Sequence, residues 1–395
     1  MKKIGVIGAG RLGICFALLC EAAGYEVLVS DIREDYVGGL NERQITTNEP
    51  EVENLLRRAK NFRATTDNRQ VIRECDLIYT LVSTPSLEDG SYDVSAVWEV
   101  VDDIKTEMTT IGNGPKNFVV GCTTNPGDCD KFREELPRSV KVFYNPEFIA
   151  QGSIIRDLRE ADMVLLGSDP MLSEDPVVSE IKDLYKKIQT TRAIVSCMST
   201  TAAEITKIAV NCYLTTKISY ANMLGDVLRK AGCGDEITNV LGAIGTDTRV
   251  GKKYLNYGVG YGGPCLPRDN RAFAAFCESL GTHHNLGFVT DGINNEHAAE
   301  IADFYASVND KKLPFWFEYV TYKKGTDIIT ESQQYRLCTD LLDRGFRVYI
   351  HNDRRVTPLI YDNLKSKYGD DVKFVDGKDH ITEPIFLLNL SLIHI

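Results

Sequence analysis

Residues 3–31 read KIGVIGAGRLGICFALLCEAAGYEVLVSD, and their pattern is the clearest indication of the fold in the first half of the chain. An apolar strand pattern, KIGVI, leads into a glycine-rich turn, GAGRLG, and then into an apolar helix pattern, ICFALLCEAAG. A second apolar strand, EVLVS, follows and ends on an aspartate. Strand, glycines, helix, second strand and acidic residue in this order predict a dinucleotide-binding βαβ unit.

Each glycine of the turn has a mechanical reason. Gly8 permits a tight turn, Gly10 lets the backbone approach a pyrophosphate, and Gly13 allows the helix to pack closely on the strand. The N-terminus of the helix then offers unpaired N–H groups to the phosphates. We therefore expect these glycines, together with Arg11 and Leu12 between them, to contact the cofactor.

The residues after the second strand indicate which dinucleotide is bound. Asp31 can accept hydrogen bonds from a ribose diol and would repel a 2′-phosphate, which favours NAD over NADP. Arg33, two residues further on, is the one feature that speaks for NADP, and we place it among the cofactor contacts as well.

Strand patterns continue along the chain at 76–85 (DLIYTLVSTP), 117–126 (NFVVGCTTNP) and 140–148 (VKVFYNPEF). They predict an α/β domain with a doubly wound parallel sheet, in which ligands bind beyond the carboxyl ends of the strands. Thr84 and Thr124 lie at two of these ends, so we expect both near the cofactor. The alternative is that each threonine simply forms a turn before proline.

Composition excludes several classes of function. The formal net charge is −11 and no run of basic residues occurs, which argues against a nucleic-acid or anionic-membrane partner. Eleven cysteines without CxxC pairs, and an N-terminus without a signal-peptide pattern, predict a reduced, cytoplasmic protein. No apolar run approaches the roughly 20 residues that span a bilayer, and no metal site is predicted.

Residues 199–230 have strong helical periodicity and no proline, which predicts one long helix between two domains and a possible dimer surface. Lys207 and Asn211, four residues apart, share one face of this helix among apolar neighbours. The alternative for this pair is a solvated lysine and a capping asparagine, because most helical lysines are exposed.

A second glycine-rich loop, YGVGYGGPCLPRDN at 257–270, holds Cys265 between Gly-Gly-Pro and Leu-Pro. The cysteine is a candidate reactive thiol, and the alternative is a small core residue. Beyond it, an apolar strand at 313–323, a helix at 332–345 and a strand at 346–353 predict a second Rossmann-like unit without GxGxxG, and ITEPIFLLN at 381–389 predicts its last strand.

Four motifs together resemble the UDP-glucose/GDP-mannose dehydrogenase family. They are NPEF at 145–148, AAEITKIAVNCYLTTKISYAN at 202–222, DTRVGKKYLNYGVGYGGPCLPRD at 247–269, and GTD at 325–327. The resemblance implies two Rossmann-like doubly wound parallel-sheet domains joined by a long central helix. It implies an NAD-binding domain over 1–198, a central dimerisation region with the cysteine loop over 199–309, and a sugar-nucleotide domain over 310–395.

The resemblance further implies a homodimer that oxidises the C6 alcohol of a nucleotide sugar to a carboxylate with two NAD. Cys265 would capture the aldehyde as a thiohemiacetal and then hold a thioester. Lys207 and Asn211 would stabilise the oxyanions. Glu147 would be the general base for thioester hydrolysis. Thr124 would position the water and Asp269 would order the thiol loop.

Several further residues fall where the family contacts its ligands, and Arg268 is expected beside the cofactor. The expected substrate contacts are Glu147, Phe148, Ile149, Gln151, Lys207, Asn211, Arg249, Tyr254, Tyr257, Gly262 and Lys323.

The sequence departs from the family pattern at two positions. Gln151 replaces a second glutamate after NPEF, and Thr330 replaces an arginine after GTD. UDP-glucose is the expected substrate, with GDP-mannose or a UDP-N-acetylhexosamine as alternatives. An alternative function is a nucleotide-sugar-binding protein with impaired turnover. A two-electron dehydrogenase is disfavoured because it has no use for Cys265.

The last six residues, LSLIHI at 390–395, match the translation of a transposon-end sequencing adapter, CTG TCT CTT ATA CAC ATC. We therefore expect that a short natural tail is missing from this sequence.

Overall fold

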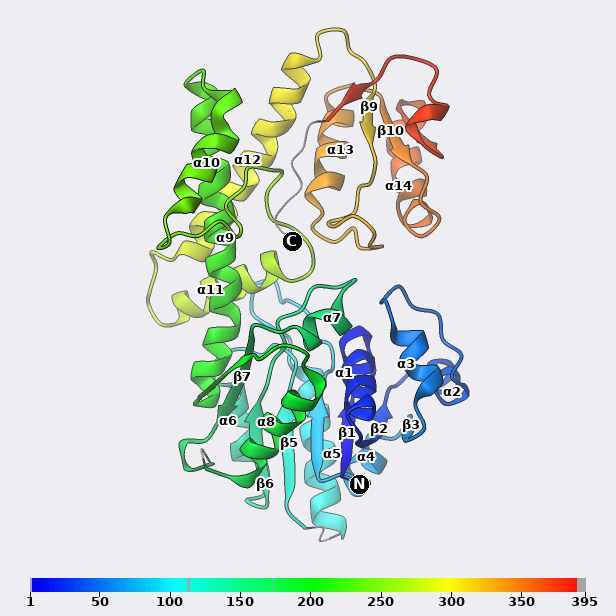
Figure 1. The fold of residues 1–395 in the computed structure, drawn as a ribbon, viewed down its shortest axis with the longest axis vertical. Helices are drawn as coiled ribbons and strands as arrows, with labels where there is room; N and C mark the ends of the chain where they lie inside the picture. Colours follow the sequence, from blue (N-terminus) through cyan, green and yellow to red (C-terminus); the bar gives the residue numbers. More distant parts are fainter. Residues whose placement is uncertain (1, 112–113, 173, 389–395) are drawn as a thin grey trace. The chain divides into compact units, whose positions relative to one another are not determined.

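The computed structural model describes residues 2–111, 114–172 and 174–388, so the predicted tail at 390–395 lies outside the described residues (Figure 1). The chain divides into two compact units, Met1–Ile208 and Ala209–Ile395. The boundary lies inside one helix, α9 (Thr200–Lys230), which is the long helix that the sequence predicts.

The first unit is built on one sheet with the strand order β3-β2-β1-β4-β5-β6-β7-β8. Its strands are β1 (Lys3–Ile7), β2 (Glu26–Ser30), β3 (Phe62–Thr65), β4 (Leu77–Thr80), β5 (Lys116–Val120), β6 (Val140–Tyr144), β7 (Met163–Ser168) and β8 (Ile194–Met198). The first six are parallel, as predicted.

The last two strands of this sheet reverse direction, which differs from the all-parallel sheet predicted from the strand patterns. β7 pairs with β6 antiparallel, and β8 then runs parallel to β7. Between β6 and β7 the chain forms only a 6-residue helix, α7 (Ile154–Arg159). Only the carboxyl ends of the two strands pair, with Tyr144 opposite Gly167 and Phe143 opposite Ser168.

Helices pack on both faces of the first sheet, because successive strand residues point to opposite faces. On β5, Val119 joins the core formed with α1 and α8, whereas Phe118 and Val120 join the core formed with α4, α5 and α6. The helices are α1 (Arg11–Ala22), α2 (Glu34–Glu42), α3 (Val52–Arg58), α4 (Asn68–Glu74), α5 (Ser95–Ile111), α6 (Asp128–Glu135) and α8 (Pro176–Ile188). The unit is doubly wound, as predicted.

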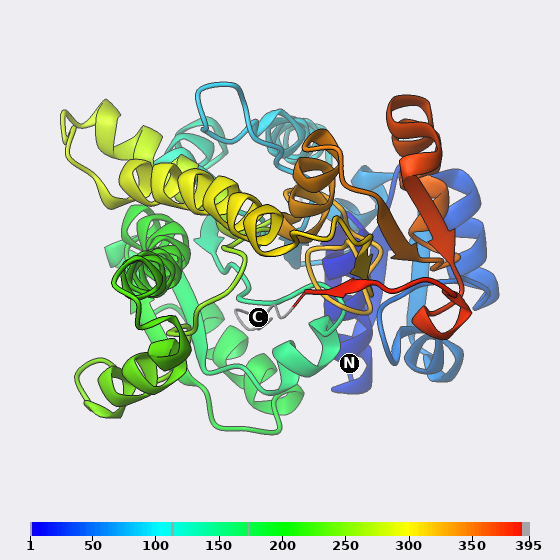
Figure 2. The ribbon, with the colours of Figure 1, turned by 90° about the horizontal axis from the view of Figure 1, so that it is seen from above.

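The second unit combines the rest of α9 with further helices and a parallel sheet of order β11-β10-β9-β12. Its elements are α10 (Ile237–Thr246), α11 (Leu266–Ser279), α12 (Leu286–Val308), β9 (Phe315–Phe317), α13 (Gln333–Asp343), β10 (Val348–His351), α14 (Thr357–Tyr368), β11 (Val372–Val375) and β12 (Phe386–Leu387). Helices α12 and α13 lie side by side in both views and share one core (Figure 2).

Two predicted strands of the second unit are shorter than their apolar patterns. The pattern over 313–323 yields only β9, because Tyr322 donates its N–H to the Ile328 carbonyl in a turn and not to a neighbouring strand. The pattern over 381–389 yields only β12, and residue 389 lies outside the described chain. Apolar residues after β9 pack in a loop, which periodicity alone does not distinguish from a strand.

No helix in the described part of the chain has the length and hydropathy needed to cross a membrane.

Candidate active site

The glycine-rich turn between β1 and α1 has the geometry that a bound pyrophosphate requires. Gly8 has φ of +94°, and a Cβ there would lie 2.8 Å from the Leu81 backbone. A Cβ on Gly13 would lie 1.9 Å from the Gly8 carbonyl oxygen, so α1 can pack on β1 only with glycine at this position. A Cβ on Gly10 would meet nothing within 4 Å, which leaves the backbone open to a ligand. The turn therefore fits NAD.

Asp31 lies at the carboxyl end of β2 and is held by Arg33. The Arg33 guanidinium donates to both carboxylate oxygens, at 2.8 and 2.9 Å, and stacks on the Tyr36 ring at 4.1 Å. Burial alone would raise the pKa of Asp31, but hydrogen bonds from the Arg33 side chain and backbone outweigh it and lower the pKa. The carboxylate is thus kept ionised, ready to accept hydrogen bonds from a ribose.

Thr84 and Thr124 are both buried and follow the adjacent strands β4 and β5. The Thr124 hydroxyl donates to Glu204 of α9 at 2.8 Å. Glu204 also accepts the backbone N–H groups of Gly127 and Cys129, at 2.7 and 3.0 Å, at the start of α6. Glu204 is not among the residues predicted from the sequence, although it lies three residues before Lys207, on the same face of the helix.

Glu147 follows β6 and is half-buried. Burial raises the pKa of its carboxyl to about 7, against the opposing effects of a hydrogen bond from Tyr185 and the positive charge of Lys207. Lys207 is 8% exposed, and its ammonium lies 4.8 Å from the Phe148 ring centroid. The alternative of a solvated lysine is therefore wrong, since Lys207 is buried beside the NPEF segment.

The segment after NPEF is fixed by side chains from elsewhere in the first unit. Ile149 packs against the core that contains α1. Gln151 accepts a hydrogen bond from Arg11 of the glycine-rich turn at 3.2 Å. The buried Glu49 accepts the Gly152 N–H at 2.6 Å. The amide at position 151 is thus connected directly to the cofactor turn.

In the second unit, Cys265 occupies the N-cap position of α11 and is half-buried. No disulfide joins any of the eleven cysteines, all of which lie within the described chain. The N-terminus of a helix stabilises a negative charge, which favours the thiolate form of a cysteine there.

Buried side chains form hydrogen bonds with the backbone of the loop that leads to Cys265. The Gly258 N–H donates to Asn222 at 2.9 Å, and its carbonyl lies 2.6 Å from the His297 ring. Asn294 accepts the Tyr261 N–H at 2.9 Å and donates to its carbonyl at 3.0 Å. Because these peptide groups are buried, each needs such a partner, and the pairing fixes the path of the loop.

Two glycines next to the cysteine have no room for a side chain. A Cβ on Gly262 would lie 2.2 Å from the Glu331 carbonyl oxygen. On Gly263, where φ is +82°, it would lie 2.3 Å from the Tyr322 ring. The turn after β9 therefore packs directly on the thiol loop.

Asn211 and Asp269 lie together in the second unit. The Asn211 side-chain amide donates to the Asp269 carboxylate at 2.7 Å, and Arg268 donates to the same carboxylate at 3.4 Å. Asp269 is completely buried, one turn after Cys265 on α11. An amide NH₂ has two hydrogens, so Asn211 keeps one for another acceptor.

The other predicted substrate residues lie in varied surroundings. Tyr257 donates its hydroxyl to the buried Asp226 at 2.8 Å. Tyr254 has φ of +61°, an uncommon conformation for a tyrosine. The Arg249 side chain is 87% exposed and pairs with Asp247 at 2.7 Å. The Lys323 carbonyl accepts hydrogen bonds within the turn after β9.

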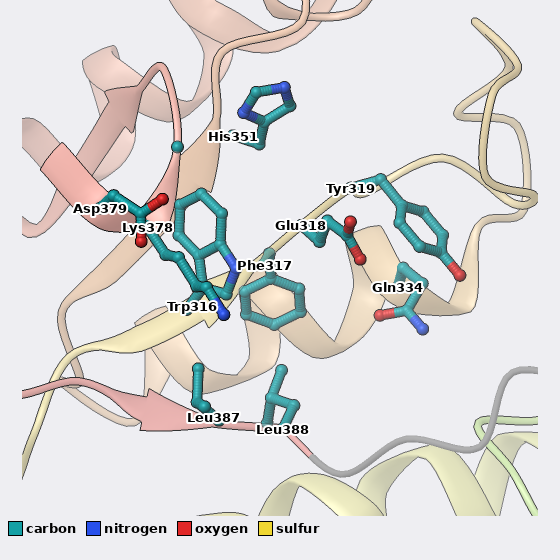
Figure 3. A pocket seen from close by; sticks show the side chains of 11 residues that line it. Trp316, Phe317, Glu318, Tyr319, Gln334, His351, Lys378, Asp379, Leu387 and Leu388 are labelled. Carbon is teal, nitrogen blue, oxygen red and sulfur yellow. The ribbon is translucent and has the colours of Figure 1, made fainter. Parts of the chain in front are cut away.

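A pocket of about 520 Å³ lies at the carboxyl ends of β9 and β10. Trp316 and His351 contribute aromatic rings whose centroids are 6.3 Å apart, and Lys378 and Asp379, from the segment after β11, line the pocket as well (Figure 3). Leu387 and Leu388 border the pocket below (Figure 3). None of the described residues that line it is a predicted substrate contact.

The candidate residues thus form two sets, one around the NPEF segment in the first unit and one around Cys265 in the second. Among the residues that the structure describes, no cluster of three histidine, cysteine or acidic side chains could hold a metal ion.

The raised pKa of Glu147 makes a prediction about stability. The unfolded carboxyl loses its proton near pH 4.5, whereas the folded one keeps it until about pH 7, so this stabilisation is lost as the pH rises through 7. We expect the free energy of unfolding of the wild type, relative to Glu147→Gln, to fall by about 2 kcal/mol between pH 5.5 and pH 8. Urea denaturation at each pH measures this difference in the free energy of unfolding, with Glu134→Gln as the surface control. A pH-independent difference would contradict the assignment.

Comparisons with known proteins identify the family. Residues 2–189 match the NAD binding domain, and residues 201–296 the central domain, of the UDP-glucose/GDP-mannose dehydrogenase family. UDP-glucose 6-dehydrogenase 1 of Arabidopsis thaliana is 30% identical over 374 residues, covering 89% of this chain and 76% of the relative. UDP-glucose 6-dehydrogenase AglM of Haloferax volcanii is 27% identical over 388 residues, covering 93% and 86%.

A solved structure agrees with these matches. A UDP-glucose dehydrogenase from the hyperthermophilic archaeon Pyrobaculum islandicum superposes with a TM-score of 0.81 at 27% identity, covering 95% of this chain and 86% of that one. The chain therefore belongs to the UDP-glucose/GDP-mannose dehydrogenase family of NAD-dependent nucleotide-sugar dehydrogenases.

Proposed function

We propose that this protein oxidises the C6 alcohol of UDP-glucose to the carboxylate of UDP-glucuronate. The observation that carries the proposal is the thiol of Cys265 at the N-terminus of α11, in a loop whose buried peptide groups are paired by side chains. A simple alcohol dehydrogenase needs no thiol, whereas a four-electron oxidation needs a group that holds the aldehyde.

The reaction proceeds in three steps on the sugar carbon. First, C6 loses a hydride and its hydroxyl loses a proton, which gives an aldehyde. The Cys265 sulfur then adds to the aldehyde, and the thiohemiacetal loses a second hydride and a proton to become a thioester. Finally, water attacks the thioester, releasing the acid and restoring the thiol. When bound, NAD supplies the hydride acceptor, one molecule for each oxidation.

The charged and amide groups have separate roles in this scheme. Lys207 and Asn211, one helical turn apart on α9, stabilise the negative charge that develops on oxygen. Glu147 takes the proton of the attacking water, and a pKa of about 7 suits a base at neutral pH. Thr124 positions the water, and Asp269 orders Asn211 and the thiol loop through its 2.7 Å hydrogen bond.

The cofactor lies along the glycine-rich turn of the first unit in this proposal. The residues that would hold it are Gly8, Gly10, Arg11, Leu12, Gly13, Asp31, Arg33, Thr84 and Thr124, with Arg268 from the second unit. The substrate would contact Phe148, Ile149, Gln151, Arg249, Tyr254, Tyr257, Gly262 and Lys323, in addition to the residues that act on C6.

Gln151 favours one alternative function, a nucleotide-sugar-binding homologue with poor turnover. Its neutral amide accepts from Arg11 and cannot act as a base, so hydrolysis relies on Glu147. A homologue that binds the nucleotide sugar but turns over poorly is therefore the second candidate. Within the dehydrogenase class, GDP-mannose and UDP-N-acetylhexosamines are the other substrates to test.

The number of NADH molecules formed per sugar consumed separates these functions. With UDP-glucose and NAD we expect two NADH and an acid product, whereas a two-electron enzyme gives one NADH and an aldehyde. Cys265→Ser should form no acid, because serine is too weak a nucleophile at its ordinary pKa. Cys277→Ser, on the same helix, is the matched control and should keep wild-type activity. Acid formed by Cys265→Ser at the native rate would refute the covalent scheme.

The Glu147→Gln variant tests the hydrolysis step alone. We expect it to release two NADH per site in a rapid burst and then to turn over about 10²–10⁴-fold more slowly than the wild type. Stopped-flow absorbance of NADH measures both phases. A variant that lost the burst while keeping the steady-state rate would assign Glu147 to another step.

We also propose that the protein is a homodimer that associates through α9. Four apolar side chains on this helix are 42–62% exposed and recur at spacings of three, four and seven residues, as on one helical face. They are Tyr213, Tyr220, Met223 and Val227. An exposed apolar stripe of this kind is typical of a protein interface.

Charge placed on this stripe should separate the subunits. We expect Tyr220→Glu combined with Val227→Glu to sediment as a monomer in analytical ultracentrifugation, because dimer formation would bury unpaired carboxylates. Leu359→Glu, an equally exposed apolar position on α14, is the control and should leave the dimer intact. A stripe variant that stayed dimeric would place the interface elsewhere.

A further inference from the structure

A chain of polar side chains lies beneath Glu147 in the core of the first unit. The Tyr185 hydroxyl, on α8, is hydrogen-bonded to the Glu147 carboxylate and lies 2.9 Å from Asn145 Oδ1. The Tyr79 hydroxyl, on β4, lies 3.3 Å from the same Oδ1. Tyr79, Asn145 and Tyr185 are at most 2% exposed.

The orientation of the Asn145 amide is determined by its other contact. Asn145 Nδ2 donates to the Leu165 carbonyl at 2.9 Å, so Oδ1 faces the two tyrosines. A carbonyl oxygen has two lone pairs and can accept from both hydroxyls. Burial raises the pKa of Tyr185 well above its usual value, so this residue keeps its proton.

One hydroxyl hydrogen must therefore serve two neighbours. If Tyr185 donates to Glu147, the glutamate is a carboxylate, and Asn145 accepts from Tyr79 alone. If Glu147 is protonated, it donates to the Tyr185 oxygen, and the Tyr185 hydrogen rotates to Asn145. Both arrangements leave every hydrogen with an acceptor, and they differ by one proton on Glu147 and one rotation of the hydroxyl.

We propose that Tyr185 is a positioning residue whose hydroxyl rotates between Glu147 and Asn145 as Glu147 gains and loses its proton. The inference rests on the proposed function, in which Glu147 takes a proton from water and must release it again. A fixed donor would favour only the carboxylate, whereas the Asn145 acceptor gives the protonated form a complete set of hydrogen bonds as well.

Other titratable groups among the described residues act on Glu147 through charge. Lys207 of α9 acts on the carboxyl through its positive charge, and Cys20 of α1 and Tyr79 of β4 interact with it electrostatically. Tyr185 is the neighbour from which a hydrogen bond to Glu147 influences its ionisation.

The Tyr185→Phe variant tests the proposal, with Tyr79→Phe as the matched control. Both remove one buried hydroxyl from the same cluster, but only Tyr185 bonds to Glu147. A donor stabilises a carboxylate more than an acceptor stabilises a neutral acid, so its loss disfavours ionisation of Glu147. We expect the acid limb of the steady-state rate with UDP-glucose and NAD to move up by about one pH unit in Tyr185→Phe. Tyr79→Phe should move the limb less, because it removes a donor to Asn145 and leaves the hydrogen bond between Tyr185 and Glu147 in place.

A second readout does not depend on catalysis. Urea denaturation from pH 5 to pH 9, with Glu147→Gln as reference, gives the midpoint of Glu147 ionisation, and this midpoint should move up by the same amount in Tyr185→Phe. Coincident midpoints in wild type and Tyr185→Phe would overturn the role of Tyr185. If the midpoint moves but no variant oxidises UDP-glucose, the positioning role holds and the proposed function fails.

Discussion

Buried polar groups along one face of α9 must each find a hydrogen-bond partner, and this requirement fixes the loops that surround the helix. This face carries polar side chains at spacings of three and four residues, and all but the half-buried Asn211 are buried. They are Glu204, Lys207, Asn211, Thr215, Ser219, Asn222 and Asp226. Leaving a buried polar group without a hydrogen bond costs roughly 1–3 kcal/mol of folding stability, so each of these side chains needs a hydrogen-bond partner.

Those partners are the segments that hold the candidate chemistry. In the first unit, Glu204 holds the Thr124 loop and the start of α6. In the second unit, Asn211 and Thr215 bond to the adjacent Asp269 and Asn270 of α11. Further along, Asn222 bonds to the backbone of the thiol loop. One helix face therefore orders two loops that are distant in sequence, the loop that contains Thr124 and the glycine-rich thiol loop.

Much of this arrangement could be predicted from local pattern, and some could not. The βαβ unit with Gly8 and Gly13 follows from periodicity and from glycine sterics, both of which are local. No local pattern marks the reversal of β7, and the short β9 depends on packing of the turn that follows it. Burial of Lys207 could not be inferred from the helix alone, because its surroundings come from the NPEF segment some 60 residues away. Tyr185 and Asn145 are likewise far apart in the sequence, and only the folded core brings them together.

The proposed function requires Cys265 to carry the sugar as a covalent intermediate. Acid quenching of the protein during turnover of ¹⁴C-labelled UDP-glucose with NAD, followed by peptide mapping, detects that intermediate. We predict label on the peptide that contains Cys265, as an acyl group released by hydroxylamine. Label on a peptide with another cysteine, or turnover to acid with no labelled peptide during the burst, would contradict the claim.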